Sequence, residues 1–355
     1  MRQLKNMGSV YCGTGVWTTL NTYLDEQSIS RAFIVTDTNT RKHCLPKLLE
    51  AAHFHTEPYI LEIPAGEKHK TIATCMDLWN ELSEQNADRN SLIINLGGGV
   101  VTDLGGFVAC TFKRGIDFVN IPTSLLAMVD ASIGGKTGVD LGTLKNQVGI
   151  IREPSLVLLD VSFLDTLPSD HLRSGQAEML KHGIIASESY FHASLDFRIN
   201  TATTEELIWE SVLIKHKIVS EDPTEKGLRK LLNFGHTLGH AIESYFLDKK
   251  PDNPLLHGEA IAIGMILATY ISSEQLEFPK ESLRKISTGI NEIYTRQTFS
   301  EADISAICKL LIYDKKNSGG KINFVLLKDF ADHEINCEVP NSLILDAFAY
   351  YSQLN

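Results

Sequence analysis

Short apolar runs alternate with helical patterns through the first part of the chain, and this alternation limits the fold more than any other feature. Strands are expected at Ala32–Val35, Pro58–Ile63, Ser91–Leu96 and Phe118–Ile121. Helices are expected between them, at Thr40–Ala52, Thr71–Glu84 and Val101–Thr111. Strands that alternate with helices build a mostly parallel sheet with helices on both faces. The sequence therefore predicts an α/β domain at the start of the chain.

Helical patterns dominate after about residue 163. They cover Ser169–Ala186, Thr204–Ser220, Leu228–Leu247, Glu259–Glu274, Pro279–Ile293 and Glu301–Tyr313. A late apolar run, Ile322–Leu327, is expected to form a strand or a hairpin. A chain of 355 residues is also longer than one compact core usually allows. We therefore predict an α/β domain over residues 1–163 and a mostly α-helical domain over residues 164–355.

Composition argues against several classes of protein. The formal net charge of -11 does not suit a nucleic-acid binder. The six cysteines include no CxxC pair and are typical of reduced cytosolic thiols. The start of the chain lacks the apolar core of a signal peptide, and the apolar stretch near Ala260–Tyr270 is shorter than the ~20 residues of a membrane span. We expect a cytoplasmic protein without a membrane or nucleic-acid partner.

A run of three glycines, Gly97–Gly99, follows one predicted strand and precedes a helix. Glycines let backbone N–H groups approach a phosphate, and a helix N-terminus favours an anion. This geometry suits a dinucleotide pyrophosphate, although Thr102 breaks the GxGxxG spacing. Asp37, just after the first strand, suits a ribose hydroxyl or a helix cap. The loop is a candidate nucleotide site, and a tight structural turn is the alternative.

A second polar cluster lies between Asp130 and Asn146, in a segment dense in glycine. Lys136 follows two glycines, and Lys145 directly precedes Asn146. A backbone that permits close approach, beside a lysine, is what an anion site needs. The alternative is a solvated loop whose charges are incidental.

Four polar residues, Arg229, Asn233, His236 and His240, are spaced so that one continuous α-helix would carry them along one side. A polar stripe on an otherwise apolar helix costs stability unless it lines a wet or liganded cavity. The stripe therefore predicts contacts with a substrate. For Arg229, a structural ion pair with Glu225 is the alternative.

Two glycines, Gly235 and Gly239, lie inside the same predicted helix, and each weakens a helix by about 1 kcal/mol relative to alanine. Close approach of a backbone or a ligand is the usual reason for such a cost. His236 and His240 have HxxxH spacing, but Thr237 stands where a zinc protease needs glutamate. The pair is either part of another metal site or two buried, hydrogen-bonded histidines.

Further metal donors occur elsewhere. Glu178 and Lys181 share one face of a predicted helix, and His257 lies just before another helix. A catalytic zinc site takes three protein ligands and leaves one position open. Glu178, His236 and His257 suit that role, although no local spacing requires it, because they are far apart in the sequence.

Longer motifs connect these residues to a known family. They are PAGEKHK at 64–70, GGGVVTDLGG at 97–106, IPTSLLAMVDASIGGK at 121–136, KN at 145–146, AEMLK at 177–181, LRKLLNFGHTLGHAIE at 228–243 and HGE at 257–259. The chain resembles the 3-dehydroquinate synthases, almost from end to end. This resemblance implies a Rossmann-like, mostly parallel N-terminal domain and a mostly α-helical C-terminal domain.

The resemblance also implies roles for single residues. The zinc ligands would be Glu178, His236 and His257. The substrate would contact Asp130, Lys136, Asn146, Lys181, Lys215, Arg229, Asn233, His240 and one of Lys315 and Lys316, taken as Lys316; of these, Lys136, Asn146, Lys181, Lys215 and His240 would be catalytic. NAD would contact Asp37, Glu67, Lys70, Gly98, Gly99, Asp103, Thr123, Ser124, Lys136 and Lys145. Arg114 would reach the substrate phosphate of the partner subunit in a homodimer.

The implied reaction belongs to the shikimate pathway of aromatic amino-acid biosynthesis. Its substrate, 3-deoxy-D-arabino-heptulosonate 7-phosphate, carries a carboxylate and a phosphate, so basic residues must converge on it. A ring alcohol is oxidised with NAD, phosphate is eliminated, the hydride returns, and an aldol step closes the ring of 3-dehydroquinate. Zinc, or cobalt in its place, would polarise the substrate oxygen, and NAD would be regenerated.

Three other functions stay open. A 2-deoxy-scyllo-inosose or epi-valiolone synthase would share fold, zinc and NAD, but Asn233, His240 and the Lys315–Lys316 pair favour a substrate with a carboxylate. A metal-dependent alcohol dehydrogenase of the glycerol type would release NADH. An inactive paralogue that serves as a binding module would be revealed by its zinc content and its lack of turnover.

Overall fold

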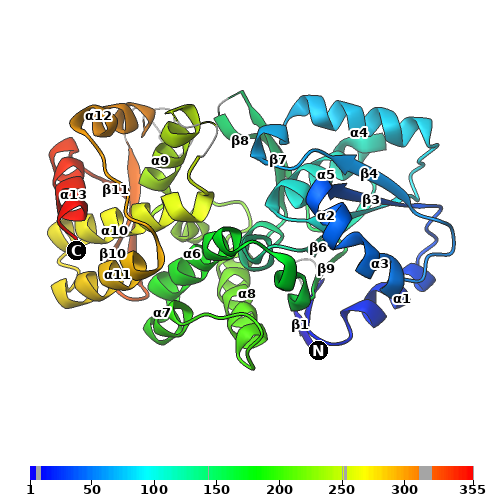
Figure 1. The fold of residues 1–355 in the computed structure, drawn as a ribbon, viewed down its shortest axis with the longest axis horizontal. Coiled ribbons are helices and arrows are strands. Elements are labelled where there is room, and N and C mark those ends of the chain that lie inside the picture. The colour runs from blue at the N-terminus through cyan, green and yellow to red at the C-terminus, as the bar shows by residue number, and fades with distance from the viewer. Residues whose placement is uncertain (5–8, 143, 250, 252–253, 312–321, 355) are drawn as a thin grey trace. The chain divides into compact units, whose positions relative to one another are not determined.

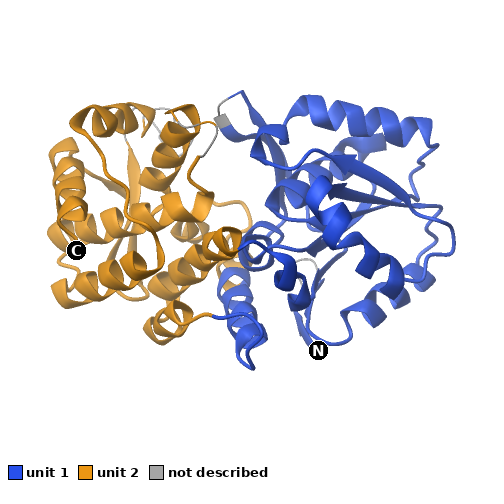
Figure 2. Cartoon of the chain, viewed as in Figure 1, with its two compact units in different colours: residues 1–168, 198–216 blue, residues 169–197, 217–355 orange. Residues whose placement is uncertain are grey.

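The computed structural model of the protein describes residues 1–354 except 5–8, 143, 250, 252–253 and 312–321. The chain divides into two compact units (Figure 2). Unit 1 comprises residues 1–168 and 198–216, and unit 2 comprises residues 169–197 and 217–355. Each unit is therefore built from two stretches of the chain.

A twisted sheet forms the centre of unit 1 (Figure 1). Within the described residues it has seven strands in the order β1-β2-β9-β6-β5-β3-β4. All neighbouring pairs are parallel except β1 with β2, so the predicted mostly parallel sheet is confirmed. The strands are β1 (Arg2–Leu4), β2 (Ser9–Cys12), β3 (Ala32–Asp37), β4 (Tyr59–Ile63), β5 (Leu92–Gly97), β6 (Asp117–Pro122) and β9 (Leu156–Leu159).

Helices cover both faces of this sheet. Alternate residues of a strand face opposite sides, and Phe33 and Val35 pack into one core with α4 (Ile72–Glu84) and α5 (Gly99–Thr111). The connections through α1 (Val16–Glu26), α2 (Thr38–His43) and α3 (Leu45–Ala51) step along the sheet in the opposite direction. Because parallel crossovers are right-handed, these three helices belong to the other face.

The helix predicted over Thr40–Ala52 is two helices. α2 ends before Cys44, and α3 carries Pro46 in its first turn. Proline lacks a backbone N–H and disfavours a helical conformation in the residue before it. The periodic pattern therefore continues across a break that the proline imposes.

The glycine-dense segment after Ala131 forms a hairpin that was not anticipated from the sequence. β7 (Lys136–Leu141) pairs antiparallel with β8 (Leu144–Ile151), and β7 packs against α5. Unit 1 also contains the short 3-10 helices η1 (Glu67–His69), η2 (Phe112–Arg114) and η4 (Val161–Thr166), and the π-helical turn η3 (Ala127–Ala131). The hairpin matters for function because it carries Lys136, Lys145 and Asn146.

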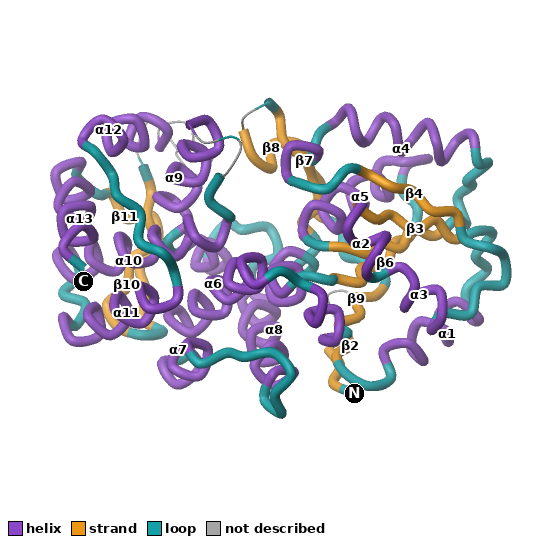
Figure 3. The backbone as a smooth tube through the Cα atoms, viewed as in Figure 1, coloured by secondary structure: helices purple, strands orange, loops and turns teal. Residues whose placement is uncertain are grey.

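Unit 2 is mostly helical, as predicted (Figure 3). α10 (His257–Gln275) is buried along most of its length and contacts α6, α9, α11, α13 and strand β10. A helix that is apolar all round is expected at the centre of a helical core. The other elements are α6 (Ser169–Ala186), α7 (Glu188–Leu195), α8 (Thr204–Glu221, shared with unit 1), α9 (His236–Lys249), α11 (Lys280–Ile293), α12 (Glu301–Leu310), α13 (Asn341–Gln353), and the hairpin of β10 (Asn323–Asp329) and β11 (Asp332–Glu338).

The helix predicted over Leu228–Leu247 is wrong in its first part. Residues Leu228–Asn233 form a 3-10 helix, η5, and α9 begins only at His236. Gly235 between them has φ +77°, a left-handed conformation that a right-handed helix cannot include. The four polar residues from Arg229 to His240 therefore do not share one straight stripe.

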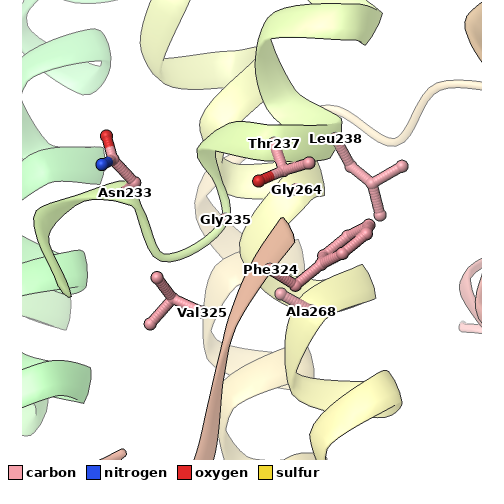
Figure 4. A pocket seen from close by; sticks show the side chains of 8 residues that line it. All are labelled: Asn233, Gly235, Thr237, Leu238, Gly264, Ala268, Phe324 and Val325. Atoms are coloured by element: carbon pink, nitrogen blue, oxygen red, sulfur yellow. The ribbon is translucent and has the colours of Figure 1, made fainter. Parts of the chain in front are cut away.

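The expectation of close backbone approach at the two glycines is confirmed. A Cβ at Gly235 would lie 2.9 Å from Met265 N, and one at Gly239 would lie 3.1 Å from Ile261 Cα. The space beside this turn, lined among others by Gly264, Leu238 and Phe324, is too narrow to admit a water molecule (Figure 4). The glycines let α9 pack directly on α10.

Across the described residues, no helix combines the length and the apolar character that crossing a membrane requires.

Candidate functional site

Three segments of unit 2 bring a carboxylate and two imidazoles together. Glu178 lies on α6 and is fully buried, His236 is the first residue of α9, and His257 is the first residue of α10. The Nε2 atoms of His236 and His257 each lie 3.5 Å from Glu178 Oε1. The donors that were far apart in the sequence therefore converge on one point.

The spacing of these atoms fits a tetrahedral zinc site. Zinc binds histidine nitrogen and carboxylate oxygen at about 2.0–2.2 Å, so two ligand atoms at the corners of a tetrahedron lie roughly 3.4 Å apart. The two distances of 3.5 Å match that edge. The donor set is also one that zinc prefers, with two imidazoles and one carboxylate.

His240 belongs to the same cluster. Its ring centroid lies 5.1 Å from that of His236 and 5.7 Å from that of His257. Ligand atoms of the three histidines lie within 4.8 Å of one another, so they form a second possible set of ligands. We favour the set with Glu178, because both imidazole Nε2 atoms lie 3.5 Å from its carboxylate oxygen and this carboxylate offsets the charge of a cation.

The electrostatics of the cluster favour a positive charge. Burial lowers the pKa of His257, but the carboxylates of Glu243 and Glu178 outweigh burial and raise the pKa to about 9. Lys181, one turn after Glu178 on α6, forms a buried ion pair with Glu178 Oε2. The negative charge of the two carboxylates, which favours the proton on His257 and the ammonium group of Lys181, also attracts a metal cation.

Arg229 and Asn233 lie on η5 and are organised by the loop before it. Asp222 accepts hydrogen bonds from the backbone N–H of Gly227 and of Arg229, at 2.7 and 3.1 Å. The guanidinium of Arg229 donates to Pro223 O at 2.8 Å, and Asn233 donates its carboxamide to Glu225 Oε1 at 2.5 Å. Thus Glu225, suggested as an ion-pair partner of Arg229, accepts a hydrogen bond from Asn233.

The residues predicted to contact NAD gather at one edge of the sheet of unit 1. The strand order reverses between β3 and β5, and ligands of open α/β sheets bind at such a switch point, beyond the carboxyl ends of the strands. Most of the set follows these ends directly: Asp37 ends β3, Glu67 and Lys70 follow β4, Gly98 and Gly99 follow β5, and Thr123 and Ser124 follow β6.

Asp37 caps a helix, as its alternative interpretation predicted. Its carboxylate accepts from the N–H groups of Asn39 and Thr40, at 2.9 and 2.8 Å. Gly98 precedes α5 as its N-cap, and a Cβ there would lie 3.2 Å from Ser124 Oγ. The glycine loop and the residues after β6 therefore lie against each other, and a side chain at Gly98 would have to displace the Ser124 hydroxyl slightly.

Other predicted residues pair within unit 1. Lys215 on α8 donates to the carboxylate of Asp130 at 2.7 Å and to its carbonyl at 2.6 Å. Asp130 sits in a π-helical turn, a local conformation that is frequent at functional sites. Lys136, at the start of β7, and Arg114, at the end of η2, are exposed. Lys315 and Lys316 lie outside the described residues.

Comparison with known proteins identifies the family. The sequence model described as "3-dehydroquinate synthase N-terminal" matches residues 60–174, and "3-dehydroquinate synthase C-terminal" matches residues 175–317. The 3-dehydroquinate synthase of Parabacteroides distasonis is 43% identical over 94% of this chain and 95% of its own length. The chain belongs to the 3-dehydroquinate synthase family.

Solved structures show the same fold in other cyclases. A 2-deoxy-scyllo-inosose synthase complexed with carbaglucose-6-phosphate, NAD+ and Co2+ superposes with a TM-score of 0.83, at 24% identity and 98% coverage of both chains. The 2-epi-5-epi-valiolone synthase of Streptomyces hygroscopicus, with NAD+ and Zn2+ bound, superposes with a TM-score of 0.83, at 24% identity and 99% coverage of both chains. The predicted two-part fold is confirmed.

In this member of the 3-dehydroquinate synthase family, Glu243 also contacts the cluster, although the sequence analysis did not single it out. Its Oε2 lies 3.3 Å from His257 Nδ1, and His236 Nδ1 lies 3.1 Å from Phe234 O. A carbonyl only accepts, so the neutral His236 ring carries its proton on Nδ1 and presents the lone pair of Nε2 to the cluster. The sequence spacing could have pointed to Glu243, because this residue follows His236 by seven positions and therefore lies on the same side of α9.

Replacing Glu243 with glutamine is expected to weaken zinc binding about 10–100-fold, because partners of a metal-bound histidine orient the ring and raise its basicity. Competition with a chromogenic chelator measures this affinity directly. Glu188→Gln is the matched control, since Glu188 pairs with the exposed His192. Equal zinc affinity in Glu243→Gln and the wild type would show that Glu243 plays no part in the site.

Proposed function

We propose that the protein converts 3-deoxy-D-arabino-heptulosonate 7-phosphate to 3-dehydroquinate and phosphate, with one bound zinc ion and NAD that is regenerated in each turnover. The observation that carries this proposal is the convergence of His236 and His257 on Glu178, in a chain that belongs to the 3-dehydroquinate synthase family. Cyclases of the same fold were solved with NAD+ and either Co2+ or Zn2+, which supports both cofactors.

The metal would be held by Glu178, His236 and His257, where it would supply Lewis-acid polarisation of a substrate oxygen. Lys181 and His240 lie beside these ligands. A lysine and an imidazole at this position suit hydrogen bonding to hydroxyl oxygens and the holding of a proton. We assign Lys181 to binding and orientation of the reacting part of the substrate, and His240 to the phosphate end.

The anionic groups of the substrate need fixed cationic and amide partners. We assign Lys136, Asn146, Arg229 and His240 to the phosphate end, and Asn233 to the carboxylate together with Lys316. A guanidinium matches a phosphate with two parallel N–H groups, and Arg229 is held in place by its bond to Pro223. The Lys215–Asp130 pair would complete the set of substrate contacts.

NAD would bind in the α/β domain, residues 1–163, across the Gly97–Gly99 loop, and would supply reversible removal of a hydride. The metal and its ligands belong to the helical domain, residues 164–355. We further propose a cytoplasmic homodimer in which Arg114 reaches the substrate phosphate of the partner subunit. Its exposed position at the end of η2 is compatible with such a role.

Turnover without net reduction of NAD is the test. The zinc-loaded protein, incubated with the heptulosonate phosphate and catalytic NAD, should release phosphate and dehydroquinate in equal amounts while absorbance at the NADH band stays flat. NADH that accumulates in proportion to product would instead identify a dehydrogenase. Preference for a sugar phosphate that lacks the carboxylate would identify one of the other cyclases.

A further inference from the structure

A polar network in unit 1 links residues of the two proposed ligand sets. Lys70 Nζ donates to Asp103 Oδ2 at 2.6 Å and to Asn146 Oδ1 at 2.7 Å. Asp103 and Lys70 belong to the proposed NAD contacts, whereas Asn146 belongs to the proposed substrate contacts. Lys70 is only 4% exposed, so water cannot replace Asp103 and Asn146 as the hydrogen-bond partners of its ammonium group.

Asp140, which has no role in the proposed function, completes this network. Its backbone N–H donates to Lys70 O at 2.9 Å, and its carboxylate accepts from the backbone N–H of Asn146 at 2.7 Å. The hydrogen bonds therefore close a ring: Lys70 to Asp140 through backbone, Asp140 to Asn146 through a side chain, and Asn146 back to Lys70 through their side chains.

The local backbone explains why Asp140 can reach Asn146. The register of the β7–β8 hairpin shifts between Val139 and Leu141, and such irregularities re-aim a side chain. Asn146 itself has φ +52°, a left-handed conformation that costs free energy and needs support from its surroundings. A carboxylate that accepts the N–H of that residue provides such support.

We propose that Asp140 is a positioning residue that holds Asn146 in its left-handed conformation, so that Lys70 can fix the carboxamide of Asn146 toward the substrate. At the irregularity, residues 145–147 of β8 lie opposite Asp140 alone, which brings the Asn146 N–H to the Asp140 carboxylate. The ring of hydrogen bonds ties the substrate contact to the lysine beside NAD. The role assigned to Asn146 rests on the proposed function, whereas the conformational role of Asp140 does not depend on it.

Two substitutions at one position separate the hydrogen bond from the charge. Asp140→Asn keeps an oxygen acceptor for the Asn146 N–H but removes the charge, and Asp140→Ala removes both. We expect kcat/KM to fall at least about tenfold in Asp140→Ala, because misplacement of a binding group by about 1 Å is that costly. Asp140→Asn should stay within about threefold of the wild type, because its hydrogen bond remains.

Two further readouts do not depend on turnover. Hydrogen exchange of the 140–150 segment should quicken in Asp140→Ala and not in Asp140→Asn, because only the alanine leaves the Asn146 amide without its acceptor. The dissociation constant for NAD should change less than about threefold in both variants, since the Lys70–Asp103 pair is retained.

Three results would overturn the proposal: wild-type kinetics and exchange in Asp140→Ala, equal impairment of the two variants, or a loss of NAD affinity as large as the loss of kcat/KM. The second would assign Asp140 to charge rather than to positioning, and the third would indicate a general collapse of the loop. If the wild-type protein itself makes no dehydroquinate, the proposed function fails, and the exchange comparison still decides the role of Asp140.

Discussion

Replacing His257 with alanine is expected to remove the metal and, with it, at least about 10³-fold of the activity, because the polarisation that a metal supplies has no substitute among neighbouring side chains. The protein should stay folded. The start of α10 is held by its own cap, in which Leu256 N donates to Glu259 Oε2 at 2.9 Å, and His257 takes no part in that bond. Zinc content by mass spectrometry and circular dichroism measure the two outcomes separately.

The controls for this result come from the same unit. His192→Ala removes an exposed histidine that pairs with Glu188 and should keep full zinc and activity. Glu178→Gln and His240→Ala decide between the two possible ligand sets, because replacing a ligand should remove zinc as completely as His257→Ala does, whereas replacing a neighbouring residue should only weaken its binding. Full zinc content in His257→Ala would contradict the proposed site outright.

Much of the fold was predictable because periodic apolar patterns reflect burial directly. The limits of α6 were predicted correctly, and the four predicted strands, β3 to β6, begin and end within two residues of the prediction, whereas β1, β2 and β9 were not predicted. The failures have local causes. Gly235 interrupts a pattern of leucines that reads as one helix, since periodicity records which side chains are buried and not the sign of a single φ angle.

The metal cluster was less accessible to local reasoning. Only the His236–His240 spacing is visible within one helix, whereas Glu178 and His257 come from other helices and meet them through packing. Donor chemistry made the set one candidate, the resemblance to a family selected it, and the geometry of the donors supports it. Asp140 shows the same limit, because its role depends on a β-bulge in a segment whose hairpin the sequence analysis did not detect.

Replacing Gly264 with alanine is expected to destabilise the protein strongly, although alanine is the better helix former by about 1 kcal/mol. A Cβ at this position of α10 would lie 2.1 Å from Gly235 O and 2.8 Å from Gly239 N, and Figure 4 shows Gly264 beside the turn that contains Gly235. These are backbone atoms of the adjacent α9 region, so the two segments must separate, and overpacking of this kind costs about 1–3 kcal/mol or more.

The same displacement reaches the metal cluster, because Gly235 directly precedes His236. Gly264→Ala should therefore lower both the midpoint of urea unfolding and the affinity for zinc. Gly289→Ala in α11 is the matched control, since a Cβ there meets only the side-chain end of Leu195, at 2.9 Å, which can rotate away. If Gly264→Ala unfolded at the same urea concentration as Gly289→Ala, the contact of α9 with α10 would be less rigid than its glycines indicate. A lower midpoint with unchanged zinc affinity would instead show that the start of α9 keeps His236 in place independently of that contact.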